Sequence, residues 1–197
     1  MKVLGRLAMA AAMLVPIGVA VAAPAGAVNT NTAACTGTTG AINSVLTNNG
    51  VGDHGGLLLA RKGSQQFKLS ATTGTDCGTV VDAGTLSAVF TTATAVNCQT
   101  ASSTTLGGHG TLKWTAPAGM GKSVANISWR WTSPTHLHYS GSVSATGSTT
   151  NVFNGQHVSG GVTTQQSLLA VANGGNCTST IPLTHFTITG WTLSIHA

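Results

Sequence analysis

Residues 123–132 alternate between apolar and polar side chains, and this pattern constrains the fold more than any other stretch of the sequence. The odd positions from 125 on are apolar and the even positions are mostly polar: Ala125, Ile127, Trp129 and Trp131 against Val124, Asn126, Ser128, Arg130 and Thr132. A period of two places these sets on opposite faces of a β-strand. The segment therefore predicts an antiparallel strand with its tryptophans in the core and its other face in water.

Two further segments continue this pattern. After a predicted turn at 133–135, the returning segment places Leu137, Tyr139 and Val143 on one parity, with His136 and His138 on the other. In residues 185–196 the apolar parity changes at a glycine: Phe186 and Ile188 precede Gly190, and Trp191, Leu193 and Ile195 follow it. An extra residue of this kind predicts a β-bulge. Shorter strands are expected at 79–81, 85–92, 111–116 and 165–172, and a hairpin at 57–72 with its turn at Gly63.

The composition supports an all-β chain. Valine, threonine, serine and glycine are abundant, and no glutamate is present. These residues favour strands and turns, whereas the strong helix formers are scarce. The sequence therefore predicts an antiparallel β-sandwich or barrel of about eight to ten short strands.

The N-terminal residues 1–27 have the layout of a secretory signal peptide. Lys2 and Arg6 precede an apolar run, and Ala25-Gly26-Ala27 is a small-residue cleavage site. This arrangement predicts export, with one secreted domain over residues 28–197 and no transmembrane segment after cleavage.

The four cysteines predict two disulfides. Cys35, Cys77, Cys98 and Cys177 all follow the predicted signal peptide, and their wide spacing does not resemble the close pairs of a zinc site. An even number in an exported chain favours pairing. Four cysteines allow three connectivities, and the sequence does not choose among them.

The sparse charges exclude one class of partner. After residue 27 the chain holds six basic residues and three aspartates, and only Arg61 and Lys62 are adjacent. Nucleic-acid binding requires clustered cations, since each phosphate contact needs its own. We therefore expect no nucleic-acid partner.

Several short motifs give the chain a family resemblance. They are Gly108-His109-Gly110-Thr111-Leu112-Lys113-Trp114, the tryptophan-rich hairpin, Phe153-Asn154-Gly155-Gln156-His157-Val158, and a late Gly-Asn-Cys before the closing strand. In these the chain resembles a broad set of uncharacterised secreted β-sandwich proteins of high-GC Gram-positive bacteria. The resemblance implies a fold and an export route, and it implies no activity.

Catalytic groups are scarce. The aspartates lie in apparent turns, where such residues usually bond to backbone N–H groups. No Gly-x-Ser-x-Gly nucleophile motif is present, and paired cysteines leave no thiol nucleophile. These observations favour a protein that is not an enzyme.

The histidines offer the main alternative. His136 and His138 would point to the same side of one strand, where they could hold Zn²⁺ or Cu²⁺ with a third ligand from His109, His157 or His185. The simpler interpretation is that they are polar surface residues. The tryptophans likewise allow two interpretations, as core residues or as an exposed platform for sugars.

The sequence thus predicts an exported, non-enzymatic protein of the cell envelope or extracellular space. Its role would be structural, or it would bind an unknown protein or a cell-wall glycan, without a cofactor. The alternative is a metal-binding protein or metalloenzyme that uses the His136/His138 face.

Overall fold

The computed structural model describes residues 31–45 and 55–197, without the side chains of 71–73. The predicted signal peptide, Asp53 and His54 lie outside the described residues. None of the helices in the described ranges is long and apolar enough to cross a membrane.

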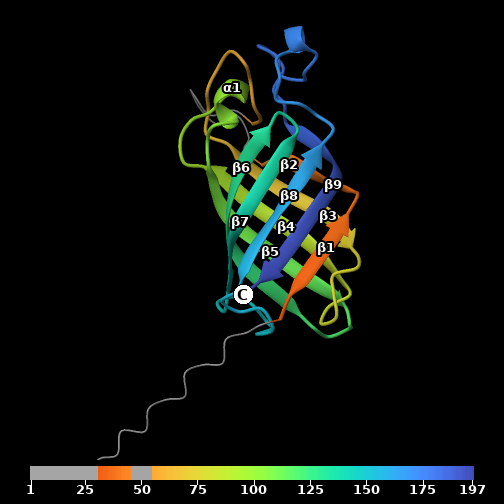
Figure 1. Cartoon of the computed structure of the whole chain (residues 1–197). Coiled ribbons are helices and arrows are strands. Elements are labelled where there is room, and N and C mark those ends of the chain that lie inside the picture. Colours follow the sequence, from red (N-terminus) through yellow and green to blue (C-terminus); the bar gives the residue numbers. More distant parts are fainter. Residues whose placement is uncertain (1–30, 46–54) are drawn as a thin grey trace, which may run out of the picture.

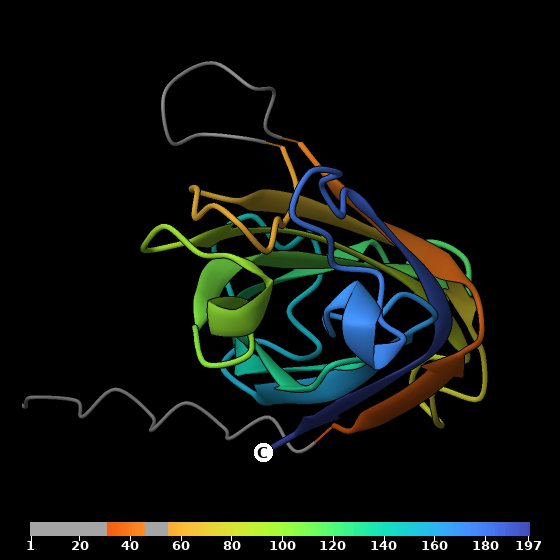
Figure 2. The ribbon, with the colours of Figure 1, turned by 90° about the horizontal axis from the view of Figure 1, so that it is seen from above.

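Nine antiparallel strands form one sheet that closes on itself (Figures 1 and 2). The strands are β1 (Ala33–Gly37), β2 (Gly40–Ser44), β3 (Gln66–Gly74), β4 (Ala83–Thr92), β5 (Leu106–Ala116), β6 (Lys122–Ser133), β7 (His136–Ser144), β8 (His157–Thr164) and β9 (His185–His196). From β2 to β9 each strand pairs with the next along the chain, and β9 then pairs with β2. The prediction of an all-β fold is confirmed, and of the two architectures left open the structure has the barrel, with eight strands plus β1.

β9 forms the seam of this barrel. One of its edges pairs with β8, and the other pairs first with β2 and then with β1. β1 and β2 therefore act as one interrupted strand. The register between β8 and β9 shifts beside Gly190, which confirms the predicted bulge and explains why the buried parity changes there.

Aromatic rings fill the barrel interior. The ring centroids of Phe90 and Trp129 lie 4.9 Å apart, and those of Trp129 and Tyr139 lie 4.7 Å apart. Phe67, Trp131 and Phe186 continue the same cluster. The predicted inward faces of β6 and β7 are confirmed, because every apolar member is buried. All four tryptophans are buried as well, so an exposed tryptophan platform is wrong.

Two disulfides fix the periphery, as predicted. Cys35–Cys77 joins β1 to the segment after β3. Cys98–Cys177 joins the short helix α1 (Cys98–Ala101) to the long connection between β8 and β9, which also carries a 3₁₀ turn at Val171–Asn173. Helix α1 and the connection between β8 and β9 lie at the same end of the barrel (Figure 1).

Three expected segments differ from the structure. Residues 57–61 and 79–81 form no strand, and the expected hairpin is replaced by single bridges from Leu57 to Leu183 and from Gly63 to Val96. Leu57 and Leu58 are nevertheless buried. Their apolar character thus reflects packing outside the regular strands. Residues 165–172 are also irregular, whereas β8, which the sequence did not predict, comes directly before them.

Candidate functional site

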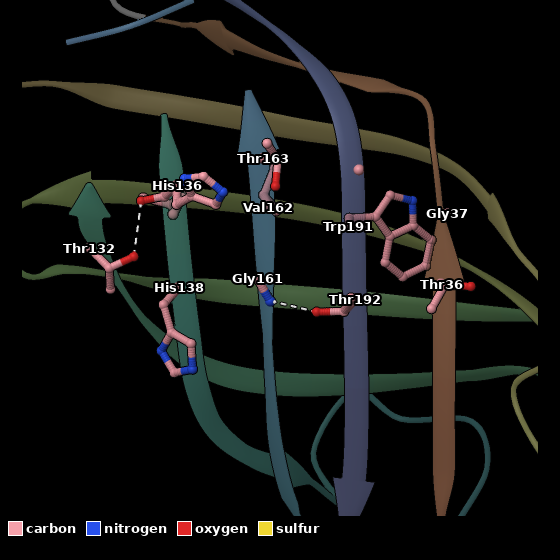
Figure 3. A pocket seen from close by; sticks show the side chains of 12 residues that line it. Thr36, Gly37, Thr132, His136, His138, Gly161, Val162, Thr163, Trp191 and Thr192 are labelled. Atoms are coloured by element: carbon pink, nitrogen blue, oxygen red, sulfur yellow. Dashed lines mark hydrogen bonds between the residues drawn. The ribbon is translucent and has the colours of Figure 1, made fainter. Parts of the chain in front are cut away.

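A groove lies on the outer face of the barrel across β7, β8, β9 and β1 (Figure 3). We call it the outer groove, and its volume is about 430 Å³. Two cross-strand rows of outward residues form most of it. In one row the register aligns His138, Gly161, Thr192 and Thr36, and in the other it aligns His136, Thr163 and Gly190.

Two glycines create the depth of the outer groove. A Cβ atom added at Gly190 would have no neighbour within 4 Å, and one at Gly161 would lie 3.6 Å from the main-chain oxygen of Leu137, an ordinary contact. Neither residue adopts a left-handed backbone conformation. Packing and backbone geometry thus leave space for a side chain at both positions. Because glycine has no side chain, this space remains open and forms part of the outer groove.

Hydrogen-bonding groups surround these glycines. Thr192 Oγ1 accepts a bond of 3.2 Å from Gly161 N, and a 2.8 Å hydrogen bond joins His136 Nδ1 and Ser133 Oγ. His138 is exposed, and its side chain has no hydrogen-bond partner among the described residues. Its two ring nitrogens are therefore open to a ligand, one as a donor and one as an acceptor in the neutral form.

The predicted metal pair, His136 and His138, does lie on the outward face of β7. Figure 3 shows the two rings apart from each other along the strand. Nowhere in residues 31–45 and 55–197 do three or more histidine, cysteine or acidic side chains gather around a possible metal position. Of the suggested third ligands, His109 bonds to Asn126 Oδ1 at 2.8 Å and His185 bonds to Asn43 Oδ1 at 2.7 Å.

The fold brings a different pair of histidines together. His157 of β8 and His196 of β9 are direct partners in the register, both are exposed, and their ring centroids lie 5.1 Å apart. The sequence suggested His157 only as a third metal ligand and did not connect it to His196. The register between β8 and β9 was the missing information, because the two residues are far apart in the sequence.

The outer groove contains no carboxylate among its lining residues. Asp76 is not among the residues that line the groove. It is exposed in a left-handed turn with φ of 56°, and its carboxylate accepts a hydrogen bond from the Thr75 hydroxyl. The groove itself therefore supplies hydroxyl, imidazole and peptide groups, and none of its lining residues carries a carboxylate.

Comparison with models of known protein families, with curated proteins and with solved structures found no match.

Proposed function

We propose that this protein is an exported, non-enzymatic binding protein of the cell envelope or extracellular space, and that its outer groove takes a segment of cell-wall glycan. The observation that carries the proposal is the groove itself, in which two glycines leave space beneath exposed histidine and threonine side chains. The two disulfides are compatible with an exported protein.

The filled interior favours a site on the outside. Barrels that hold a small molecule need a cavity between their strands. Here Trp129 lies in that space, with Phe90 and Tyr139 packed against it. A ligand inside would have to displace several buried rings. The outer groove requires no such rearrangement.

The chemistry of the groove suits a neutral sugar chain. Threonine hydroxyls and neutral imidazoles both donate and accept hydrogen bonds, as sugar hydroxyls do. The half-buried backbone at Gly161 and Gly190 offers a flat surface on which C–H groups of a sugar ring would pack. No charged lysine, arginine or acidic side chain lines the groove.

Gly190→Val tests this function, because Gly190 lines the groove and a Cβ atom added there would have no neighbour within 4 Å. Gly107→Val is the matched control: Gly107 faces outward on β5, and a Cβ there would also have no neighbour within 4 Å. Soluble oligosaccharides of N-acetylglucosamine, the neutral sugar of cell-wall glycan, would be titrated by calorimetry into the wild type and both variants. We expect binding by the wild type and Gly107→Val, and a loss of at least about tenfold in Gly190→Val. No binding by the wild type, or equal affinity in both variants, would overturn the proposal.

Metal binding is the second candidate, and the geometry favours His157 and His196 over His136 and His138. In a tetrahedral zinc site each nitrogen lies about 2.0–2.1 Å from the metal, which places two imidazole centres about 5 Å apart. The observed 5.1 Å matches this separation. The remaining ligands would be water molecules.

Calorimetric titration with Zn²⁺ and Cu²⁺ separates the two histidine pairs. We expect binding to persist in His136→Ala/His138→Ala and to disappear in His157→Ala. The opposite pattern would return the metal to the β7 face, and no binding by the wild type would remove this candidate function altogether.

A further inference from the structure

Two lysines lie directly opposite each other on the neighbouring strands β5 and β6. Lys113 of β5 and Lys122 of β6 are direct partners in the register, and both are exposed. They line a hollow of about 530 Å³ together with the hydroxyl-bearing residues Ser87, Thr111 and Thr149. No residue lines both this hollow and the outer groove, so what the hollow binds is independent of the function proposed above.

The lysine pair is electrostatically unfavourable as it stands. Like charges directly opposite each other on a sheet destabilise it. No acidic residue lines the hollow, and neither ammonium group forms an ion pair with an acidic residue in the described ranges. The chain has only six basic residues after position 27, and it places two of them against each other. A bound anion would convert this repulsion into attraction to a shared partner.

The surroundings of the two lysines are fixed by hydrogen bonds. The backbone N–H of Lys122 donates a hydrogen bond of 2.9 Å to Thr149 Oγ1, and the backbone N–H of Thr149 donates one of the same length to the main-chain oxygen of Lys122. On the adjoining row of the sheet Ser87 and Thr111 are register partners. Hydroxyl donors thus lie beside the two ammonium groups, and the loop that carries Thr149 is held against β6.

A second hollow continues the first. It is lined by Gly119 and Thr149, which both hollows share, and by further polar groups: Ser148, Thr150, Asn151 and Asn154. The combined surface is longer than a single small anion requires. Its polar extension suits a chain that passes beyond the lysines.

From these observations we propose that Lys113 and Lys122 bind the phosphate groups of an anionic polymer. A phosphate offers several acceptor oxygens, so two ammonium groups and neighbouring hydroxyls can bond to it together. The hydroxyls would orient the phosphate, and the second hollow would hold the next unit of the chain.

The test measures binding of short-chain polyphosphate by calorimetry at low ionic strength. Lys113→Met and Lys122→Met each remove one member of the pair. Lys68→Met is the matched control, since Lys68 is exposed on β3 and its register partners, Asn43 and Val89, are uncharged. We expect each pair variant to lose about tenfold in affinity and the control to lose less than about threefold. Added salt should weaken wild-type binding.

Three results would overturn the proposal. Equal losses in all three variants would indicate attraction to net charge alone, and absence of wild-type binding would remove the site. Equal affinity for inorganic phosphate would contradict the assignment to a polymer. Urea unfolding of the same variants keeps the test independent of folding, because removal of one like charge should leave the pair variants at least as stable as the wild type at low salt.

Discussion

The hydroxyl of Tyr139 on β7 donates a 2.7 Å hydrogen bond to the main-chain oxygen of Thr192 on β9, across the intervening strand β8. Gly160 of β8 makes this contact possible. A Cβ atom at Gly160 would lie 2.1 Å from Thr192 O and 2.5 Å from the tyrosine Oη. The bond links the buried aromatic cluster to a residue whose hydroxyl lines the outer groove.

Gly160→Ala should therefore be strongly destabilising, and Gly161→Ala should not. The first methyl group would collide with the backbone of β9 and with Tyr139, whereas the second would make ordinary contacts. We expect Gly160→Ala to lower the free energy of unfolding in urea by about 3 kcal/mol or more. Gly161→Ala should lower it by less than about 1 kcal/mol. Similar losses for the two variants would contradict the position of the Tyr139 side chain, which passes over Gly160 to reach Thr192.

Ionisation of Tyr139 should coincide with unfolding at alkaline pH. Burial raises the pKa of this hydroxyl above its usual value of about 10. Because the folded pKa is the higher one, the associated stability is complete below pH about 10 and is lost as the pH rises above it. Tyr139 is the only tyrosine of the chain, so phenolate absorbance reports on it alone. Phenolate formation well before the loss of the far-ultraviolet circular dichroism signal would show that the hydroxyl is accessible in the folded state.

The two faces of β6 should differ sharply in their tolerance to substitution. Trp131 is 2% exposed and contacts the rings of Phe67 and Phe186, whereas Arg130 is exposed. Trp131→Ala should cost about 3–5 kcal/mol of unfolding free energy, and Arg130→Ala less than about 1 kcal/mol. Chemical denaturation measures both, and equal costs would be inconsistent with the assigned faces.

Each disulfide should contribute comparably to stability. Cys35–Cys77 spans 42 residues and Cys98–Cys177 spans 79. In the chain-entropy model, loops of this length each stabilise the fold by about 4 kcal/mol. Paired replacement by alanine and calorimetric unfolding would measure each contribution. Alkylation of the native protein without reductant should label none of the four cysteines, and labelling of any one would contradict this pairing.

The sequence predicted those strands whose own side chains alternate clearly. Residues 123–132 and 185–196 carry large apolar groups on a definite parity, and the position of the bulge followed from Gly190. β8 was missed because Gly160 and Gly161 interrupt its alternation. The need for glycine at 160 arises from a tyrosine on the preceding strand, which no local pattern contains.

The candidate sites were harder to predict, because they depend on register. His136 and His138 are two residues apart and were noticed, but the spacing of neighbours along one strand says nothing about the strands beside it. Gly190, His196 and Lys122 acquire their roles only from the residues opposite them on β8 and β5. The register between neighbouring strands depends on the closure of the entire barrel. The local pattern of one sequence does not predict this register.

The pairing of β9 also removes the last unpaired strand edges of the barrel, those of β2 and β8. A hydrogen bond across the seam joins Asn43 to His185, which is 142 positions later in the chain. A ribosome makes β1 and β2 early and β9 last among these strands, so each growing chain passes through a period in which β2 and β8 both have an unpaired edge. Such edges recruit strands from other molecules. We therefore expect variants that delay the pairing of residues 185–196 with β2 and β8 to aggregate during production, even when the finished barrel is stable.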